Sequence, residues 1–233
     1  MLETYVQEIL ELLPVLIFAG ISAGLLAGLF GVGGGLVVVP SVYFILLHQG
    51  LSTELAMTIA VATSLASIIP TAISSLIAHH QLGNVQWGIV RLWVPALVIG
   101  VVLGSFSVAA LQSPALVGVF GVLLLFVASN KLLGQRFIRP LPNLPSRGVQ
   151  WLAAFIIGFI SALAGVGGGA TGVPTLTAFG TPIHKAVGTC AAMGLFVAAP
   201  ATIILLVVAQ PSTNLPGVFQ LLYLPALLVL APL

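Results

Sequence analysis

Charged side chains are scarce in this sequence: of 233 residues, six are Lys or Arg and four are Asp or Glu. Soluble globular domains carry roughly 25% charged residues, whereas this chain has 4%, with a hydrophobic share of 60% and a mean hydropathy of +1.26. A water-facing surface cannot be built from this composition, which excludes a soluble enzyme and a secreted module. The six cations are too dispersed for the basic stripe that binds phosphate backbones, so we expect no nucleic-acid partner.

The residues that enzymes and metal sites use are scarce too. The single cysteine, Cys190, cannot form an intrachain disulfide. Three of the four carboxylates precede residue 12, and neither an H-E-x-x-H motif nor a nucleotide-binding Gly-Lys-Ser/Thr motif is present. We therefore expect no enzymatic activity, no cofactor and no metal site.

Long apolar runs fill most of the chain instead. They occupy residues 12–47, 55–78, 92–111, 115–133, 149–179, 186–209 and 218–233. A helix needs about 20 apolar residues to cross the hydrocarbon core, because every backbone polar group must be paired within the segment. The runs predict an all-α polytopic protein whose main partner is the lipid bilayer.

The distribution of cations predicts how the chain is oriented. Cytoplasmic loops carry the excess of Lys and Arg in membrane proteins. Arg91, between Trp87 and Trp93, places the loop 79–91 on the cytoplasmic side. The segment 131–147 is the predicted cytoplasmic linker, because it contains four of the six cations, Lys131, Arg136, Arg139 and Arg147.

An internal repeat divides the chain into halves, 1–139 and 140–233. The segment GVGGG at 31–35, followed by Pro40, recurs at 165–169, followed by Pro174, an offset of 134 residues. The segment AVATS at 60–64 recurs as AVGTC at 186–190, and VPAL around Pro95 recurs as LPAL around Pro225. Three markers in the same order indicate a duplication.

Each glycine segment interrupts an apolar run. The residues after the first one, 36–47, are too few to cross the bilayer as a helix. The sequence therefore predicts a broken span or a re-entrant hairpin, and a hairpin would make the two repeats inverted. Glu54 near the first following loop and Lys185 in the second favour inversion, since they place these loops on opposite sides.

The glycine segments are the candidate binding site. Each precedes a helix, so free amide N–H groups and the positive end of a helix dipole point into the break, which suits an oxyanion. The alternative is that the glycines only allow close helix packing and that nearby hydroxyls bond back to their own helix. The candidate substrate-binding residues are Gly33, Gly34, Gly35, Thr63, Ser64, Gly167, Gly168, Gly169, Thr189 and Cys190.

The two glycine motifs resemble those of a known family. AGLFGVGGGLVVVP at 27–40, ALAGVGGGATGVP at 162–174 and AVGTC at 186–190 are similar to the sulfite exporter TauE/SafE family of prokaryotic membrane transporters. The resemblance implies export, across the inner membrane, of small sulfur-containing anions such as sulfite, thiosulfate or organosulfonates. An anion channel that uses the same amides is the alternative. Compared with the family pattern, the second repeat lacks a last helix. The sequence leaves open whether the protein forms a homodimer.

Overall fold

The structure is a computed structural model that describes residues 34–111, 115–137, 145–208 and 217–230, with several scattered residues between 14 and 24. The elements are α2 (Gly35–His48), α3 (Thr53–Gln81), α4 (Trp87–Leu111), α5 (Ala115–Phe137), α6 (Arg147–Ala164), α7 (Gly169–Ala178), α8 (Ile183–Val208), β1 (Val218–Phe219), β2 (Leu222–Tyr223) and α9 (Leu224–Leu230). The prediction of an all-α polytopic protein is confirmed, because four of these helices, α3, α4, α6 and α8, are long and apolar enough to span a membrane.

Two of the apolar runs differ from continuous helices. The run 149–179 is divided into α6 and α7 by the second glycine segment. The run 218–233 begins as a β-hairpin, in which Gln220, with positive φ, lies in the turn that pairs Phe219 with Leu222 before α9. Helices α2 and α7 have 14 and 10 residues, which are too few to cross the hydrocarbon core.

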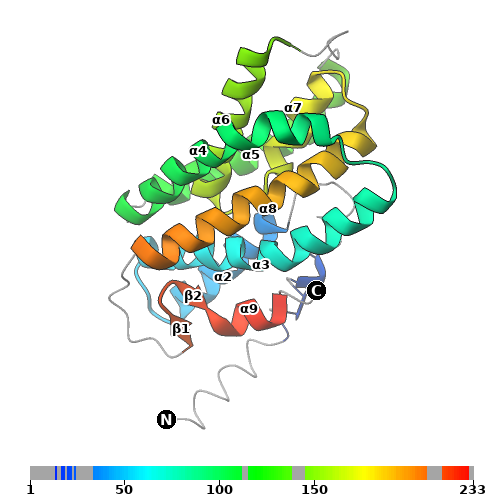
Figure 1. Cartoon of the computed structure of the whole chain (residues 1–233). Helices are drawn as coiled ribbons and strands as arrows, with labels where there is room; N and C mark the ends of the chain where they lie inside the picture. Colours follow the sequence, from blue (N-terminus) through cyan, green and yellow to red (C-terminus); the bar gives the residue numbers. More distant parts are fainter. Residues whose placement is uncertain are drawn as a thin grey trace.

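Helices α3 and α8, which carry the repeated AVATS and AVGTC segments, lie side by side and run in opposite directions (Figure 1). A β-carbon at Gly194 would lie 3.7 Å from that of Ala72, and Asn84, just beyond α3, packs against Gly188 near the start of α8. This antiparallel course is what inverted repeats require. The inversion of the whole repeats remains a prediction.

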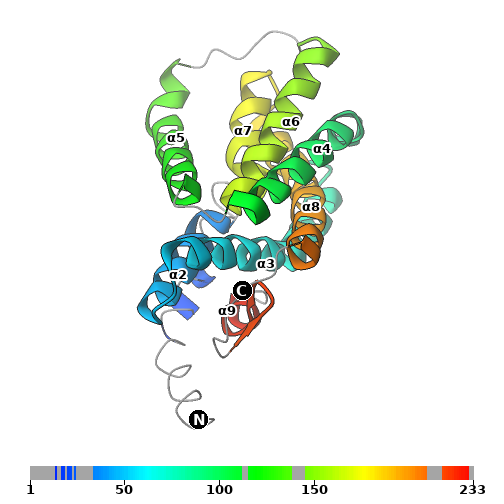
Figure 2. The same ribbon diagram turned by 90° about the vertical axis from the view of Figure 1, so that its left-hand side faces the viewer.

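Helices α4 and α6 join the two halves at backbone contact (Figure 2). A β-carbon at Gly104 of α4 would lie 2.6 Å from the carbonyl oxygen of Phe159, and one at Gly158 of α6 would overlap the carbonyl oxygen of Leu97. Gly100 faces α6 in the same way. Glycines on both helices thus allow the close approach that is typical of packing within membranes.

Helices α6 and α7 form a re-entrant hairpin. The indole N–H of Trp93 donates to Oε1 of Gln150 near the start of α6, at 3.1 Å. The same ring packs edge-on against Phe179, which follows the last residue of α7, with 6.1 Å between the ring centroids. Helix α7 therefore returns toward the end from which α6 starts, and the chain turns at the second glycine segment.

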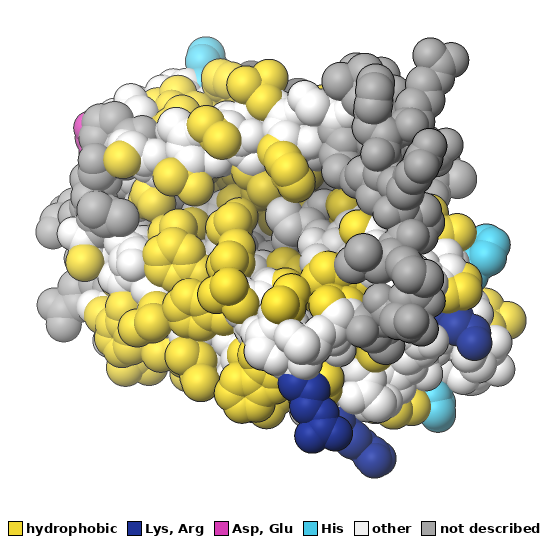
Figure 3. All heavy atoms as spheres, turned by 90° about the horizontal axis from the view of Figure 1, so that it is seen from above, with side chains coloured by type: hydrophobic (Ala, Val, Ile, Leu, Met, Phe, Trp, Pro, Cys, Tyr) yellow, Lys and Arg dark blue, Asp and Glu magenta, His cyan; other side chains and the backbone are white. Residues whose placement is uncertain are grey.

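The described charges are segregated along the molecule. Arg91, Arg147 and Lys185 lie in the first turns of α4, α6 and α8, which meet at one end, hereafter the basic end. Glu54 lies at the start of α3, and this helix reaches the basic end only after 29 residues. On the face shown in Figure 3, the acidic side chain lies apart from the Lys and Arg side chains. The positive-inside rule favours a cytoplasmic basic end.

Candidate functional site

The two glycine segments meet in the interior. A β-carbon at Gly35, the first residue of α2, would lie 2.5 Å from the carbonyl oxygen of Gly165 and 2.9 Å from Cα of Val166. Only glycine allows the two backbones to approach this closely. Gly34 precedes α2 and is half-buried, whereas the predicted site residue Gly33 lies outside the described residues.

Gly165 ends α6 in a left-handed conformation with φ +65°. The N–H of Val166 donates to the carbonyl oxygen of Ser161 at 3.0 Å and that of Gly165 to Ala162 at 3.4 Å, which is a Schellman motif. The hydroxyl of Ser64, in α3, donates to the carbonyl oxygen of Gly165 at 2.7 Å. Ser64 therefore ties the first repeat to the second glycine segment.

Gly167 and Gly168 differ from these glycines because packing does not require them. Neither has positive φ. The nearest atom to an added β-carbon would be a methyl carbon of Ile68 or of Val197, in each case at an ordinary 3.6 Å. By contrast, a β-carbon at Gly172 would lie 2.9 Å from Sγ of Cys190. At 167 and 168, then, the fold has room for the methyl group of an alanine, so packing does not explain why both residues are glycine.

Gly168 and the residues just after it carry donors that have no partner in the part of the chain that the structure describes. The N–H of Ala170 donates to the carbonyl oxygen of Gly167 at 3.4 Å, and the first bond of the α-helical i→i−4 type in α7 runs from the N–H of Gly172 to the carbonyl oxygen of Gly168, at 2.9 Å. The amides of Gly168, Gly169 and Thr171 donate to none of the described residues. The Thr171 side chain is 8% exposed, and its hydroxyl oxygen is buried without a partner among the described residues.

The direction of Thr171 brings its hydroxyl to the same place. Cα–Cβ bonds in a helix tilt toward the N-terminus, so this side chain lies over the turn that contains Gly167 and Gly168. Neutral donors and the positive end of the helix dipole therefore lie together in one buried turn. Such a position can hold an anion without a buried cation.

Thr63 and Thr189 accept hydrogen bonds from segments outside the glycine breaks. Oγ1 of Thr63 accepts from the N–H of Tyr223 at 3.0 Å, and Oγ1 of Thr189 accepts from the N–H of Gln86 at 3.1 Å. In each case the threonine's own O–H remains as a donor. Cys190 is buried beside Gly172.

Among the predicted site residues, Gly35 and Ser64 thus contact Gly165 in the second glycine segment, and Cys190 contacts Gly172 just after it. Thr63 and Thr189 contact the segments that precede α9 and α4 instead. Thr171 is a candidate that the repeat comparison missed. With the offset of 134 residues its counterpart is Val37, so the duplication carries no signal for it.

The family model described as "Sulfite exporter TauE/SafE" matches residues 16–233. The chain belongs to the sulfite exporter TauE/SafE family. A Haemophilus influenzae "Probable membrane transporter protein" is 34% identical over 186 residues, which are 77% of this TauE/SafE chain and 68% of the relative. A Methanocaldococcus jannaschii protein with the same description is 31% identical over 181 residues, 77% of this chain and 67% of its own. A Bacillus subtilis relative is 26% identical over 182 residues, which are 70% of this chain and 66% of the relative.

The chain therefore spans about two thirds of the length of these relatives. No solved structure is significantly similar to it. Its family and relatives place this TauE/SafE chain among membrane transporters rather than enzymes. Its apolar helices make it a multi-pass membrane protein.

Proposed function

We propose that this protein exports small sulfur-containing anions, such as sulfite, thiosulfate or organosulfonates, across an inner membrane. The basic end and the linker 131–147 would face the cytoplasm. The observation that carries the proposal is the pair Gly167 and Gly168, where packing leaves room for a methyl group, next to donors that have no partner among the described residues. A ligand that approaches the amides is the physical reason for glycine at these positions.

The chemistry of the donors favours an oxyanion. Each oxygen of a sulfite or sulfonate group accepts hydrogen bonds, and the amides of Gly168 and Gly169 with the hydroxyl of Thr171 offer several in one place. A helix N-terminus stabilises negative charge, whereas a buried Lys or Arg would be costly in the bilayer. The first segment, Gly33, Gly34 and Gly35, would complete the site together with Thr63, Ser64, Gly167, Thr189 and Cys190.

A carrier is supported over an anion channel by the burial of the break. Every residue from 161 to 173 is buried, so the second glycine segment is closed to both sides. A carrier predicts saturating flux and trans-stimulation in proteoliposomes, and a channel predicts single-channel currents.

The test compares two glycines that both have room for a methyl group. Gly168→Ala places it among the unpaired donors, whereas Gly194→Ala places it in α8, 3.7 Å from Ala72. In proteoliposomes we expect Gly168→Ala to lose at least tenfold in the flux of radiolabelled sulfite and thiosulfate, with an unchanged melting temperature. Gly194→Ala should transport like the natural chain. Equal transport by the two variants would contradict the proposed site.

A further inference from the structure

Two hydrogen bonds of the same kind link the halves of the chain reciprocally. Thr63 of α3 accepts from the backbone N–H of Tyr223, the residue immediately before α9. Thr189 of α8 accepts from the backbone N–H of Gln86, the residue immediately before α4. The two threonines occupy equivalent positions in the repeated AVATS and AVGTC segments. Each half thus uses its threonine to hold the start of a helix of the other half.

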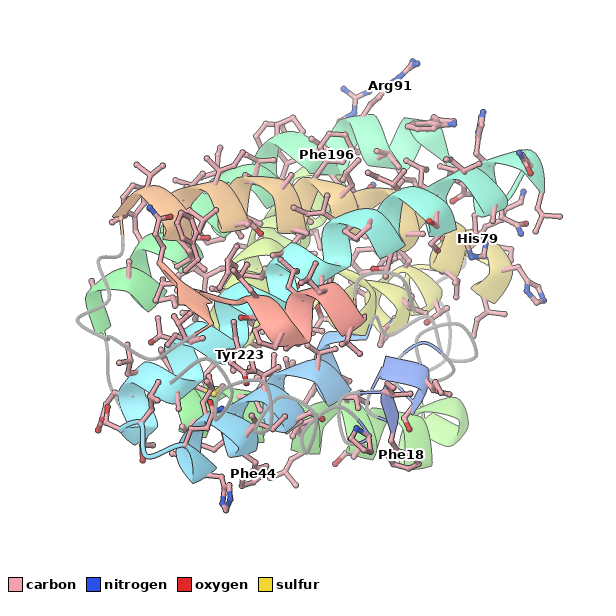
Figure 4. All side chains as sticks on the ribbon, turned by 90° about the horizontal axis from the view of Figure 1, so that it is seen from below. Phe18, Phe44, His79, Arg91, Phe196 and Tyr223 are labelled. Carbon is pink, nitrogen blue, oxygen red and sulfur yellow. The ribbon has the colours of Figure 1, made fainter. Side chains whose placement is uncertain are left out.

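These two contacts lie toward opposite ends of the molecule. Gln86 adjoins Asn84, which packs against Gly188 at the basic end. The hydroxyl oxygen of Tyr223 accepts from Nε2 of Gln49 at 3.2 Å, and Gln49 follows α2 at the end where α3 begins. In Figure 4, His79 and Arg91 lie near the edge of the molecule, while Tyr223 lies in the interior, away from both.

Both contacts use donors that can be released at small cost. An N–H at the start of a helix has no partner within that helix. A threonine from the other half satisfies it in the closed form, and water can satisfy it once the segments separate. Loss of one such bond shifts an equilibrium by about threefold to tenfold, which is suited to a contact that must open in every cycle.

We infer that Thr189–Gln86 is the inner gate contact and Thr63–Tyr223 the outer gate contact of this protein. The inference extends the proposed function, since gates at both ends are what a carrier with a central site needs. Both contacts are made in the structure, and the second glycine segment between them is buried. The structure is therefore the occluded form, with neither side open.

The only cysteine provides a reporter for the inner gate contact. Cys190 is 2% exposed and follows Thr189 directly. The measurement is the rate at which a membrane-impermeant methanethiosulfonate labels it in membrane vesicles of either orientation, with no transported anion present. Lys185→Cys in a Cys190→Ser chain marks the face on which the basic end lies, because Lys185 is exposed.

Thr189→Val removes the hydroxyl and keeps the shape of the side chain. We expect it to raise the labelling of Cys190 from the basic face by about threefold to tenfold. Thr189→Ser, which keeps the acceptor, should behave like the natural chain. Thr58→Val is the matched control, because the Thr58 hydroxyl is equally buried but donates to Glu54 within its own helix.

Thr63→Val tests the outer gate contact, and its effect on labelling is expected from the opposite face of the membrane. It should leave the labelling of Cys190 from the basic face unchanged or lower. In a chain with Ala66→Cys and Cys190→Ser, it should raise labelling from the other face by a similar factor, since Ala66 lies one turn from Thr63 on α3. A rise from the same face in both valine variants, or no rise in either, would overturn the inference.

This labelling needs no substrate, so it separates the two proposals. Gate responses without transport of sulfite or thiosulfate would refute the proposed function and leave the gate contacts supported. Transport of these anions with no change in labelling in either valine variant would refute the gate contacts and leave the proposed function supported.

Discussion

Replacing Ser64 with alanine removes the only described side-chain contact to the Gly165 carbonyl, the 2.7 Å hydrogen bond between α3 and the second glycine segment. Ser64 is fully buried, so in the variant this carbonyl loses its partner in a place that water does not reach. A buried acceptor left without a partner costs about 1–3 kcal/mol. For a chain of this size each kcal/mol lowers the melting temperature by about 2–4 °C. We expect the Ser64→Ala variant to melt about 2–12 °C below the natural chain.

The matched control for this prediction is Ser67→Ala. Ser67 is also buried, but its hydroxyl donates to the carbonyl oxygen of Ser64 within the same helix, at 2.8 Å. The Ser64 carbonyl keeps its place in the backbone hydrogen bonding of the helix. Loss of the Ser67 hydroxyl should therefore cost less than about 0.5 kcal/mol. A maleimide dye that fluoresces on reaction with the buried Cys190 reports unfolding in detergent. Equal melting temperatures for the two variants would show that the bond to Gly165 does not support the break.

Three further predictions concern the candidate site and the contacts between α4 and α6. Thr171→Val should reduce the increase in melting temperature that saturating sulfite produces by more than half, and a full increase would remove Thr171 from the site. Gly158→Ala should abolish the folded protein, because its methyl group would overlap the Leu97 backbone; normal expression and melting would contradict the contact between α4 and α6. Trp93→Phe should lower the melting temperature by about 2–12 °C, since Gln150 loses a buried donor, and an unchanged melting temperature would mean that this bond adds no stability.

The glycine repeat allowed much of the architecture to be predicted. Two glycine segments in apolar runs predict breaks, and the short helices that follow Gly34 and Gly168 are present. The residue types could not choose between a broken span and a hairpin. That choice depends on where Phe179 packs, and its contact with Trp93 is tertiary.

Other parts of the site left no mark in the sequence. Thr171 has an apolar counterpart in the first repeat, so a comparison of repeats passes over it. Gln86 and Tyr223 act through their backbone N–H groups, which every residue except proline possesses. A pattern of side chains cannot reveal such donors, because only the folded chain decides which threonine they meet.

The backbone contact between α4 and α6 limits how this protein can move. Gly100 and Gly104 come from one half of the chain and Gly158 from the other, and at these points each glycine meets the backbone of the other helix, with the methyl group of Ala162 also against Gly104. We expect this close contact to hold α4 and α6 together as one unit during transport. Any rearrangement that opens the site would then lie between this unit and α3 and α8, within each half, and not between intact halves.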